Sequence, residues 1–170
     1  MPRDADLRRL GSSRTLQDGS EIQLSNLAGS VQVLAMVYTH CEHACPRIIA
    51  DMHRIRSQLK ESKGRVDYLL VSLDPERDDV ERLAHFAKTS RLGQDWTLLR
   101  AADRTVRELA AALGIRYRRV SKEEFIRSSV ISVLDAYPPT LQGKLSFVFP
   151  GQSSRNSRPS NFPELRQVLM

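Results

Sequence analysis

Two nearly unbroken apolar runs constrain most strongly what this chain of 170 residues can fold into. They are VQVLAMVY, at residues 31–38, and VDYLLVSL, at residues 66–73, and both are rich in branched side chains. Because neither run alternates polar with apolar positions, we expect two strands that are buried on both faces of a sheet. Such a sheet has to be covered by helices on both sides, which predicts an α/β protein.

Three segments have the spacing of amphipathic helices. In residues 46–62, apolar side chains recur every three or four positions, at Ile48, Met52, Ile55 and Leu59. Residues 74–90 predict a turn and a second helix, whose inward side chains are Val80, Leu83 and Ala84. Residues 103–114 predict a third helix, with Asp103 as its N-cap and Gly114 at its end.

Shorter elements complete the expected order. An Asp18-Gly19 turn between segments of alternating polarity indicates an N-terminal β-hairpin. Further strands are expected at residues 96–101, 128–135 and 144–150, and a last helix at residues 162–170. Strands that alternate with helices predict a mainly parallel sheet, with an antiparallel edge formed by the closing strands. We expect residues 1–13 to be a flexible segment and residues 14–170 to form one domain.

The charge pattern limits the class of partner. The chain has 26 basic and 20 acidic residues, a net charge of +6, and the basic residues are scattered along it. The scattering argues against nucleic-acid binding, and the excess of positive charge indicates either solubility alone or a preference for an acidic partner surface or an anionic membrane. No run of 18 apolar residues and no apolar leader is present, so the protein is either cytoplasmic or exported by a signal or anchor outside this sequence.

Both cysteines lie in the stretch YTHCEHACPRI, residues 38–48. Cys41 follows the first buried strand, whereas Cys45 and Pro46 open the first helix. Functional sites of α/β sheets gather at the carboxyl ends of strands, and the start of a helix stabilises a thiolate. Cys41 is therefore expected to be a more reactive thiol than a cysteine of the core.

The C-x3-C spacing leaves several chemistries open. The two thiols can close a disulfide, or they can converge on one soft cation. Structural zinc normally needs four protein ligands, whereas Cu(I) accepts two or three, so copper fits this set of residues better. A structural disulfide, or two inert thiols, remains the simpler alternative.

A resemblance to a known family narrows these alternatives. YTHCEHACP, followed about 30 residues later by VSLDPERDD, is similar to the two motifs of the Sco/SenC family. The resemblance implies a thioredoxin-like fold, with a central mixed sheet flanked by helices and an N-terminal β-hairpin. It also implies copper handling outside the cytoplasm, a role in maturing the copper site of cytochrome c oxidase, and thiol–disulfide reduction.

The resemblance assigns roles to single residues. Cys41 and Cys45 match the two copper-binding, redox-active cysteines of the family. The third copper ligand of the family is a histidine, and its position falls on Arg127 in the stretch EFIRSSVISVLD. A guanidinium cannot ligate copper, but beside the cysteines it would stabilise a thiolate. His43, between the two thiols, is the candidate for a substitute ligand.

The remaining histidines and acidic residues are expected to be structural. We expect His40 to face away from the thiols, His53 to be solvated on the flank of its helix, and His85 to lie on the surface or pack locally. The acidic stretch DPERDD lacks the glycine and the closing glutamate of a calcium loop, so we interpret it as a turn and helix start capped by Asp78.

Three functional hypotheses follow. The first is a Sco/SenC-like copper metallochaperone. The second is a thiol–disulfide oxidoreductase of the same fold, in which Cys41 attacks a partner disulfide and Cys45 resolves the mixed disulfide. The third is a binding module with a structural disulfide. The expected partner is a protein with a thiol or copper site, such as a cytochrome c oxidase subunit. The expected location is the periplasm or the mitochondrial intermembrane space, with a membrane anchor outside this sequence.

Overall fold

A computed structural model of the chain describes residues 14–22, 30–42, 44–59, 66–121, 125–127, 131–134 and 145–148. The expected flexible N-terminal segment and the expected last helix lie outside these residues, as does His43. The side chains of the strand residues Arg127 and Val133 also lie outside the description.

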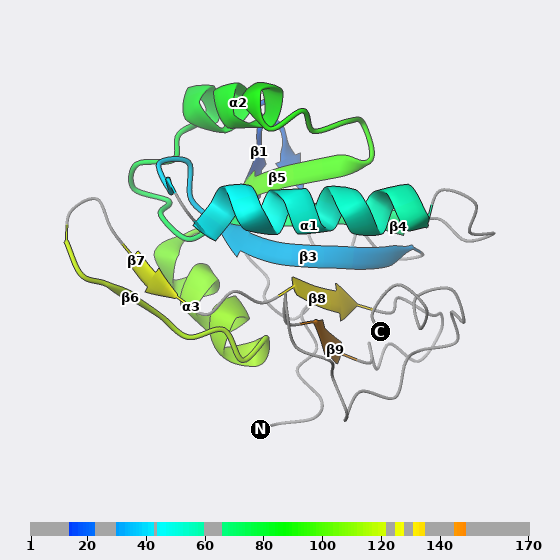
Figure 1. Cartoon of the computed structure of the whole chain (residues 1–170). Helices are drawn as coiled ribbons and strands as arrows, with labels where there is room; N and C mark the ends of the chain where they lie inside the picture. Colours follow the sequence, from blue (N-terminus) through cyan, green and yellow to red (C-terminus); the bar gives the residue numbers. More distant parts are fainter. Residues whose placement is uncertain are drawn as a thin grey trace.

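A mixed sheet forms the centre of the described structure, with the strand order β2-β1-β5-β4-β3-β8-β9 (Figure 1). Strands β3, β4 and β5 are parallel to one another, whereas β1 pairs antiparallel with β5, and β8 pairs antiparallel with both β3 and β9. The strands are β1 Arg14–Leu16, β2 Glu21–Ile22, β3 Val31–Val37, β4 Val66–Ser72, β5 Trp96–Arg100, β8 Ile131–Leu134 and β9 Leu145–Val148. The expected N-terminal hairpin, parallel centre and antiparallel edge are confirmed.

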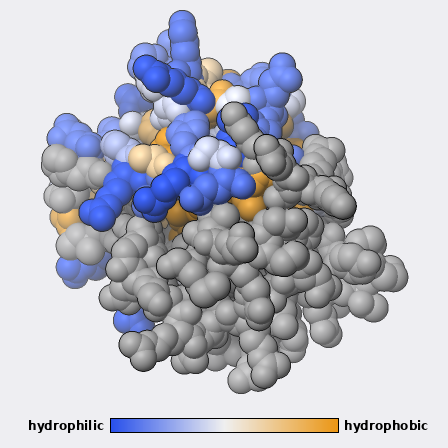
Figure 2. Space-filling model, turned by 45° about the vertical axis from the view of Figure 1, so that its right-hand side comes forward, coloured by the Kyte–Doolittle hydropathy of each residue, from blue (hydrophilic) through white to orange (hydrophobic). Residues whose placement is uncertain are grey.

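Three helices flank this sheet: α1 Ala44–Gln58, α2 Val80–Thr89 and α3 Asp103–Ala112. Figure 1 shows α1 lying along β3, while α2 lies over the end of the sheet formed by β1 and β5. On the face shown in Figure 2, hydrophilic side chains cover most of the described surface, with small hydrophobic patches between them. Apolar side chains of the strands and helices form a buried cluster between the layers.

The predicted burial holds for the strands and for the first helix. Every residue of β3 is buried, and so are the last five residues of β4, because helices cover both faces. The predicted face of the first helix is buried at Ile48, Met52 and Ile55 of α1 and at Leu59, which directly follows it. In α2, Leu83 is buried as predicted, but Ala84 is exposed because the inward face continues instead through Phe86 and Ala87.

The predicted helix caps are partly wrong. Asp79, not Asp78, caps α2 and accepts a hydrogen bond from the backbone N–H of Arg82 at 2.9 Å. The cap position of α3 is Ala102, and Asp103 is instead the first helical residue. Gly114 does follow the end of α3, with a φ of 67° that glycine adopts without the steric cost of a side chain.

A second hairpin was not predicted. Strands β6 Tyr117–Arg119 and β7 Phe125–Arg127 pair antiparallel outside the main sheet. In Figure 1 this hairpin lies beside the N-terminal end of α1. Three-residue strands rich in arginine carry no hydrophobic period, so the sequence pattern did not indicate them. Arg127, expected just before a sheet strand, is the last residue of β7 and pairs with Tyr117 at the open end of this hairpin.

The packing of α1 leads to a stability prediction. Met52 is completely buried, so replacing it with alanine leaves a cavity under the helix and should lower the free energy of unfolding by about 2–5 kcal/mol. Arg54→Ala, on the exposed face of the same helix, should change it by less than about 0.5 kcal/mol. Urea unfolding followed by circular dichroism measures both. Equal effects of the two substitutions would contradict this packing.

Candidate thiol and copper site

The two cysteines lie in one tight connection between β3 and α1. The chain turns after Tyr38, where the N–H of Cys41 donates to the Tyr38 carbonyl at 3.2 Å. Cys45 lies in the first turn of α1. The structure holds both residues as thiols rather than as a disulfide. Cys45 is fully buried in the core, whereas Cys41 is only half-buried, so the two sulfur atoms differ in access to a partner.

The start of α1 donates directly to the more accessible sulfur. The backbone N–H of Cys45 points at the Sγ of Cys41, with a nitrogen–sulfur distance of 3.2 Å. N–H groups in the first turn of a helix have no partner within the helix and carry partial positive charge. They stabilise a thiolate more than a neutral thiol, which is the arrangement that the sequence predicted for Cys41.

Tyr38 supplies a second donor to the same sulfur, and this role was not predicted. Burial, and then a hydrogen bond to Cys41, raises the pKa of Tyr38 to about 12, so its phenol stays protonated at neutral pH. The ring is buried against Phe125, with ring centres 5.1 Å apart, and the phenol oxygen accepts from the Phe125 N–H at 3.5 Å. Tyr38 therefore links Cys41 to the β6–β7 hairpin.

A buried carboxylate, that of Asp78, holds the turn before Cys41 in place. The Asp78 side chain is 0% exposed and accepts from the Thr39 hydroxyl at 2.6 Å and from the Ser72 hydroxyl at 2.5 Å. The Thr39 N–H also points at both carboxylate oxygens, at 3.3 Å. Asp78 thus joins the turn to the end of β4, which explains why it is unavailable as a helix cap.

A second buried carboxylate, that of Asp74, gathers positive side chains beside the turn. It accepts from Arg77 Nε at 2.5 Å and from Arg119 Nη2 at 2.8 Å. The Nε2 atom of His40 lies 3.3 Å from Asp74, and its Nδ1 atom lies 3.8 Å from Asp78. His40 therefore points at the two aspartates, a contact that was not predicted.

The other two histidines lie away from the thiols. His53 is half-buried on α1, where its Nε2 atom lies 3.0 Å from the Ser90 carbonyl and its ring packs 4.8 Å from that of Trp96. The expectation that His53 is solvated on the helix flank is therefore only partly met. His85 is exposed on α2, as expected for a surface residue.

The described side chains supply two sulfur ligands for a soft cation. Within the described residues, no group of three histidine, cysteine or acidic side chains is placed to hold a metal ion. The backbone of Arg127 lies in β7, two residues after the Phe125 that packs on Tyr38. The hairpin thus brings the chain at Arg127 to the neighbourhood of the site, and the roles of Arg127 and His43 stay predictions.

Comparison with known proteins identifies the family. A family model described as SCO1/SenC matches residues 9–139, more than half of the chain. This chain belongs to the SCO1/SenC family. The curated SCO1 protein homolog of Bacillus subtilis is 34% identical over 84 residues, which cover 49% of this chain and 44% of that relative. The matched stretch thus spans less than half of the relative's length.

Solved structures of SCO1/SenC proteins confirm the thioredoxin-like fold. A SCO1/SenC family lipoprotein from Bacillus anthracis superposes with a TM-score of 0.72 at 22% identity, over 92% of this chain and 88% of that one. BsSco superposes with a TM-score of 0.71 at 22% sequence identity, over 92% of this chain and 86% of that one. That structure is described with a disulfide switch and as a member of the Sco family of cytochrome c oxidase assembly proteins. Copper-bound ScoI of Arabidopsis thaliana superposes with a TM-score of 0.70 at 20% sequence identity, over 82% of this chain and 86% of that one.

None of the helices in the described part of the SCO1/SenC chain has the length and apolarity needed to cross a membrane.

The Asp78 contacts predict a large stability effect. Asp78→Ala removes the acceptor for the buried Ser72 hydroxyl, the half-buried Thr39 hydroxyl and one N–H, so we expect the free energy of unfolding to fall by about 2–4 kcal/mol. The exposed cap variant Asp79→Ala should cost about 1 kcal/mol. Chemical denaturation of both variants measures the difference, and a smaller loss for Asp78→Ala than for Asp79→Ala would refute the role of Asp78.

The unequal burial of the thiols predicts selective alkylation. Treatment of the reduced protein with iodoacetamide should modify Cys41 at least about tenfold faster than Cys45, because only Cys41 is accessible. Peptide mass spectrometry at successive times separates the two sites, and Cys41→Ser checks whether Cys45 remains slow by itself. Faster labelling of Cys45 would contradict the described burial.

Proposed function

We propose that this SCO1/SenC protein binds copper as cargo and exchanges thiols through the Cys41–Cys45 pair, assisting maturation of the copper site of cytochrome c oxidase. The observation that carries the proposal is the helix-start geometry, in which the N–H of Cys45 donates to the Sγ of an accessible Cys41. Two thiols four residues apart, one just before α1 and the other in its first turn, suit both a two-electron couple and a soft cation.

Copper binding would use the two sulfur atoms as ligands. Cu(I) prefers thiolates and accepts two or three ligands, so Cys41 and Cys45 fit it, with His43 as the candidate third ligand. The copper-bound Arabidopsis thaliana ScoI structure supports the assignment, because the same fold holds copper there. The first turn of α1 would favour the deprotonated sulfur that a copper ligand requires.

Thiol exchange would proceed in two steps with unequal roles for the cysteines. The Cys41 thiolate attacks one sulfur of a partner disulfide, forms a mixed disulfide and releases the other partner sulfur as a thiolate. The Cys45 thiolate then attacks the Cys41 sulfur and releases the second partner sulfur. Two electrons pass to the partner, and a Cys41–Cys45 disulfide remains. The greater exposure of Cys41 supports its role as attacking thiol.

The second candidate function is thiol–disulfide exchange without retained copper. It is favoured by Arg127, which occupies the expected position of the third ligand, and by the two-ligand set of the described residues. A guanidinium beside two thiolates would stabilise their charge and oppose a bound cation.

The partner and the compartment follow from the same proposal. A protein with a thiol or copper site, such as a cytochrome c oxidase subunit, would be the recipient. Such exchange takes place outside the cytoplasm, in a periplasm or intermembrane space. The lipoprotein character of the Bacillus anthracis neighbour supports this location.

A Cu(I) titration of the reduced protein against a competing chelator tests the choice between the two functions. We expect weak retention in the parent chain and a gain of at least about tenfold in affinity for Arg127→His, because the substitution supplies an imidazole ligand. Arg127→Lys keeps the charge without a ligand and should behave like the parent. Cys41→Ser should abolish binding.

Two results would decide against parts of this proposal. Equal affinities of the parent and Arg127→His would show that residue 127 does not reach the copper, leaving His43 as the third ligand. Copper binding that survives Cys41→Ser would show that the cysteine pair is not the copper site.

A further inference from the structure

The inner face of the β6–β7 hairpin is fixed against the thiol site. Phe125 packs on Tyr38, and its N–H donates to the phenol oxygen that also serves Cys41. The guanidinium of Arg119 lies 5.1 Å from the centre of the Phe125 ring and donates to the buried Asp74 at 2.8 Å. These contacts place the hairpin beside Cys41. They also determine which face of the hairpin is exposed to solvent.

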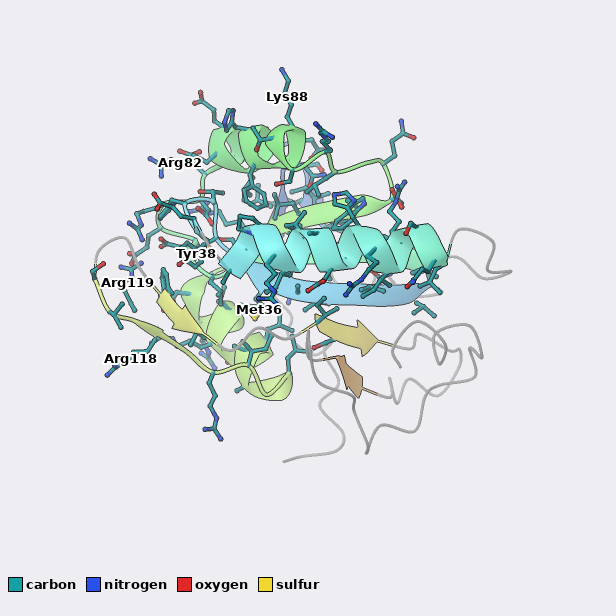
Figure 3. The ribbon with its side chains drawn as sticks, in the orientation of Figure 1. Met36, Tyr38, Arg82, Lys88, Arg118 and Arg119 are labelled. Atoms are coloured by element: carbon teal, nitrogen blue, oxygen red, sulfur yellow. The ribbon has the colours of Figure 1, made fainter. Side chains whose placement is uncertain are left out.

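The outer face of the hairpin carries exposed arginines and one apolar side chain. Successive residues of a strand point to opposite sides, so Arg118 faces away from the side on which Arg119 meets Asp74, and Val120 directly follows the end of β6. Arg118 and Val120 are both exposed, and Val120, with 41% exposure, is the large apolar residue that stands out on the described surface. Arg116, also exposed, precedes Arg118 by two positions. Figure 3 shows Arg118 directed outward from the body.

The positive charge of the segment that contains β6 and β7 indicates that it would bind an acidic partner. Residues 114–127 contain five basic and two acidic side chains, a net charge of +3 within a chain of net charge +6. Arginines next to an exposed apolar side chain match a segment in which carboxylates flank an apolar residue. Complementary charge of this kind accelerates encounter and fixes orientation more than it adds affinity.

We propose that Arg116, Arg118 and Val120 form a docking surface, the β6 outer face, for an acidic segment of the protein that exchanges sulfur or copper with Cys41. The inference rests on the proposed function of the thiol pair and adds the chemical class of its partner. A protein is favoured over an anionic membrane because the hairpin that carries this surface also packs on Tyr38, beside the half-buried Cys41 that a partner's sulfur or copper ligand has to reach.

Peptide binding tests the docking surface independently of thiol chemistry. The probe is a short peptide with several aspartates around a leucine and a serine, compared with the same peptide carrying lysines. Calorimetry should detect the aspartate peptide alone, with an affinity that falls as salt is raised. The double variant Arg116→Glu, Arg118→Glu should lower it at least about tenfold. Lys88→Glu, on exposed α2, makes the same change of charge elsewhere and should have no effect.

Thiol exchange then tests whether docking serves Cys41. The serine of each peptide is replaced by a cysteine held as a mixed disulfide with thionitrobenzoate. Attack by the Cys41 thiolate forms a bond to the peptide sulfur and releases the coloured thiolate, and Cys45 then displaces the peptide thiol. The parent should react roughly tenfold faster with the aspartate peptide than with the lysine peptide at low salt, and the double variant should lose this preference.

The outcomes separate this inference from the proposed function. Equal binding of both peptides, or equal loss of binding in the double variant and in Lys88→Glu, would overturn the docking surface even if thiol exchange proceeds. Binding of anionic phospholipid vesicles that needs Arg116 and Arg118, without peptide binding, would also overturn it in favour of a membrane contact. Specific peptide binding without release of the coloured thiolate would support the docking surface and count against the thiol function.

Discussion

The thiol end of this SCO1/SenC protein depends on the buried carboxylate of Asp78. A carboxylate without solvent is tolerated only if nearby donors satisfy it, and here the donors come from the turn before Cys41 and from the end of β4. The turn, the strand end and the start of α2 are therefore held together. Asp74 extends this cluster to Arg77 and Arg119, so that the β6–β7 hairpin joins the same unit.

Beside this hydrogen-bonded cluster, the cysteine before α1 and the cysteine in its first turn have different surroundings. Cys45 lies in the core between α1 and the sheet, whereas Cys41 meets solvent and receives donors from the Cys45 N–H and from Tyr38. In the proposed function, this difference in access would let Cys41 attack or ligate first and Cys45 complete the reaction.

Predictions from the sequence succeeded where a repeating pattern decides the structure. The buried strands and the apolar face of α1 follow from hydrophobic periodicity, and the first hairpin follows from Asp18-Gly19. Predictions were weaker where a side chain can form hydrogen bonds either with neighbouring residues or with residues distant in the sequence. Asp78 has the residue type and the position expected of an N-cap of α2, but its carboxylate instead accepts hydrogen bonds from the hydroxyls of Thr39 and Ser72 in the interior. The β6–β7 hairpin was missed because its strands are short and charged.

The sequence by itself determined the thiol pair, its place between a buried strand and a helix, and the family to which the chain belongs. These properties are local, because they depend on residue types within about a dozen positions and on periodicity. Only the tertiary structure decided what surrounds the thiols. Thr39 meets Asp78 across 39 positions and Arg119 meets Asp74 across 45, and such contacts depend on strand register and burial that no local pattern encodes.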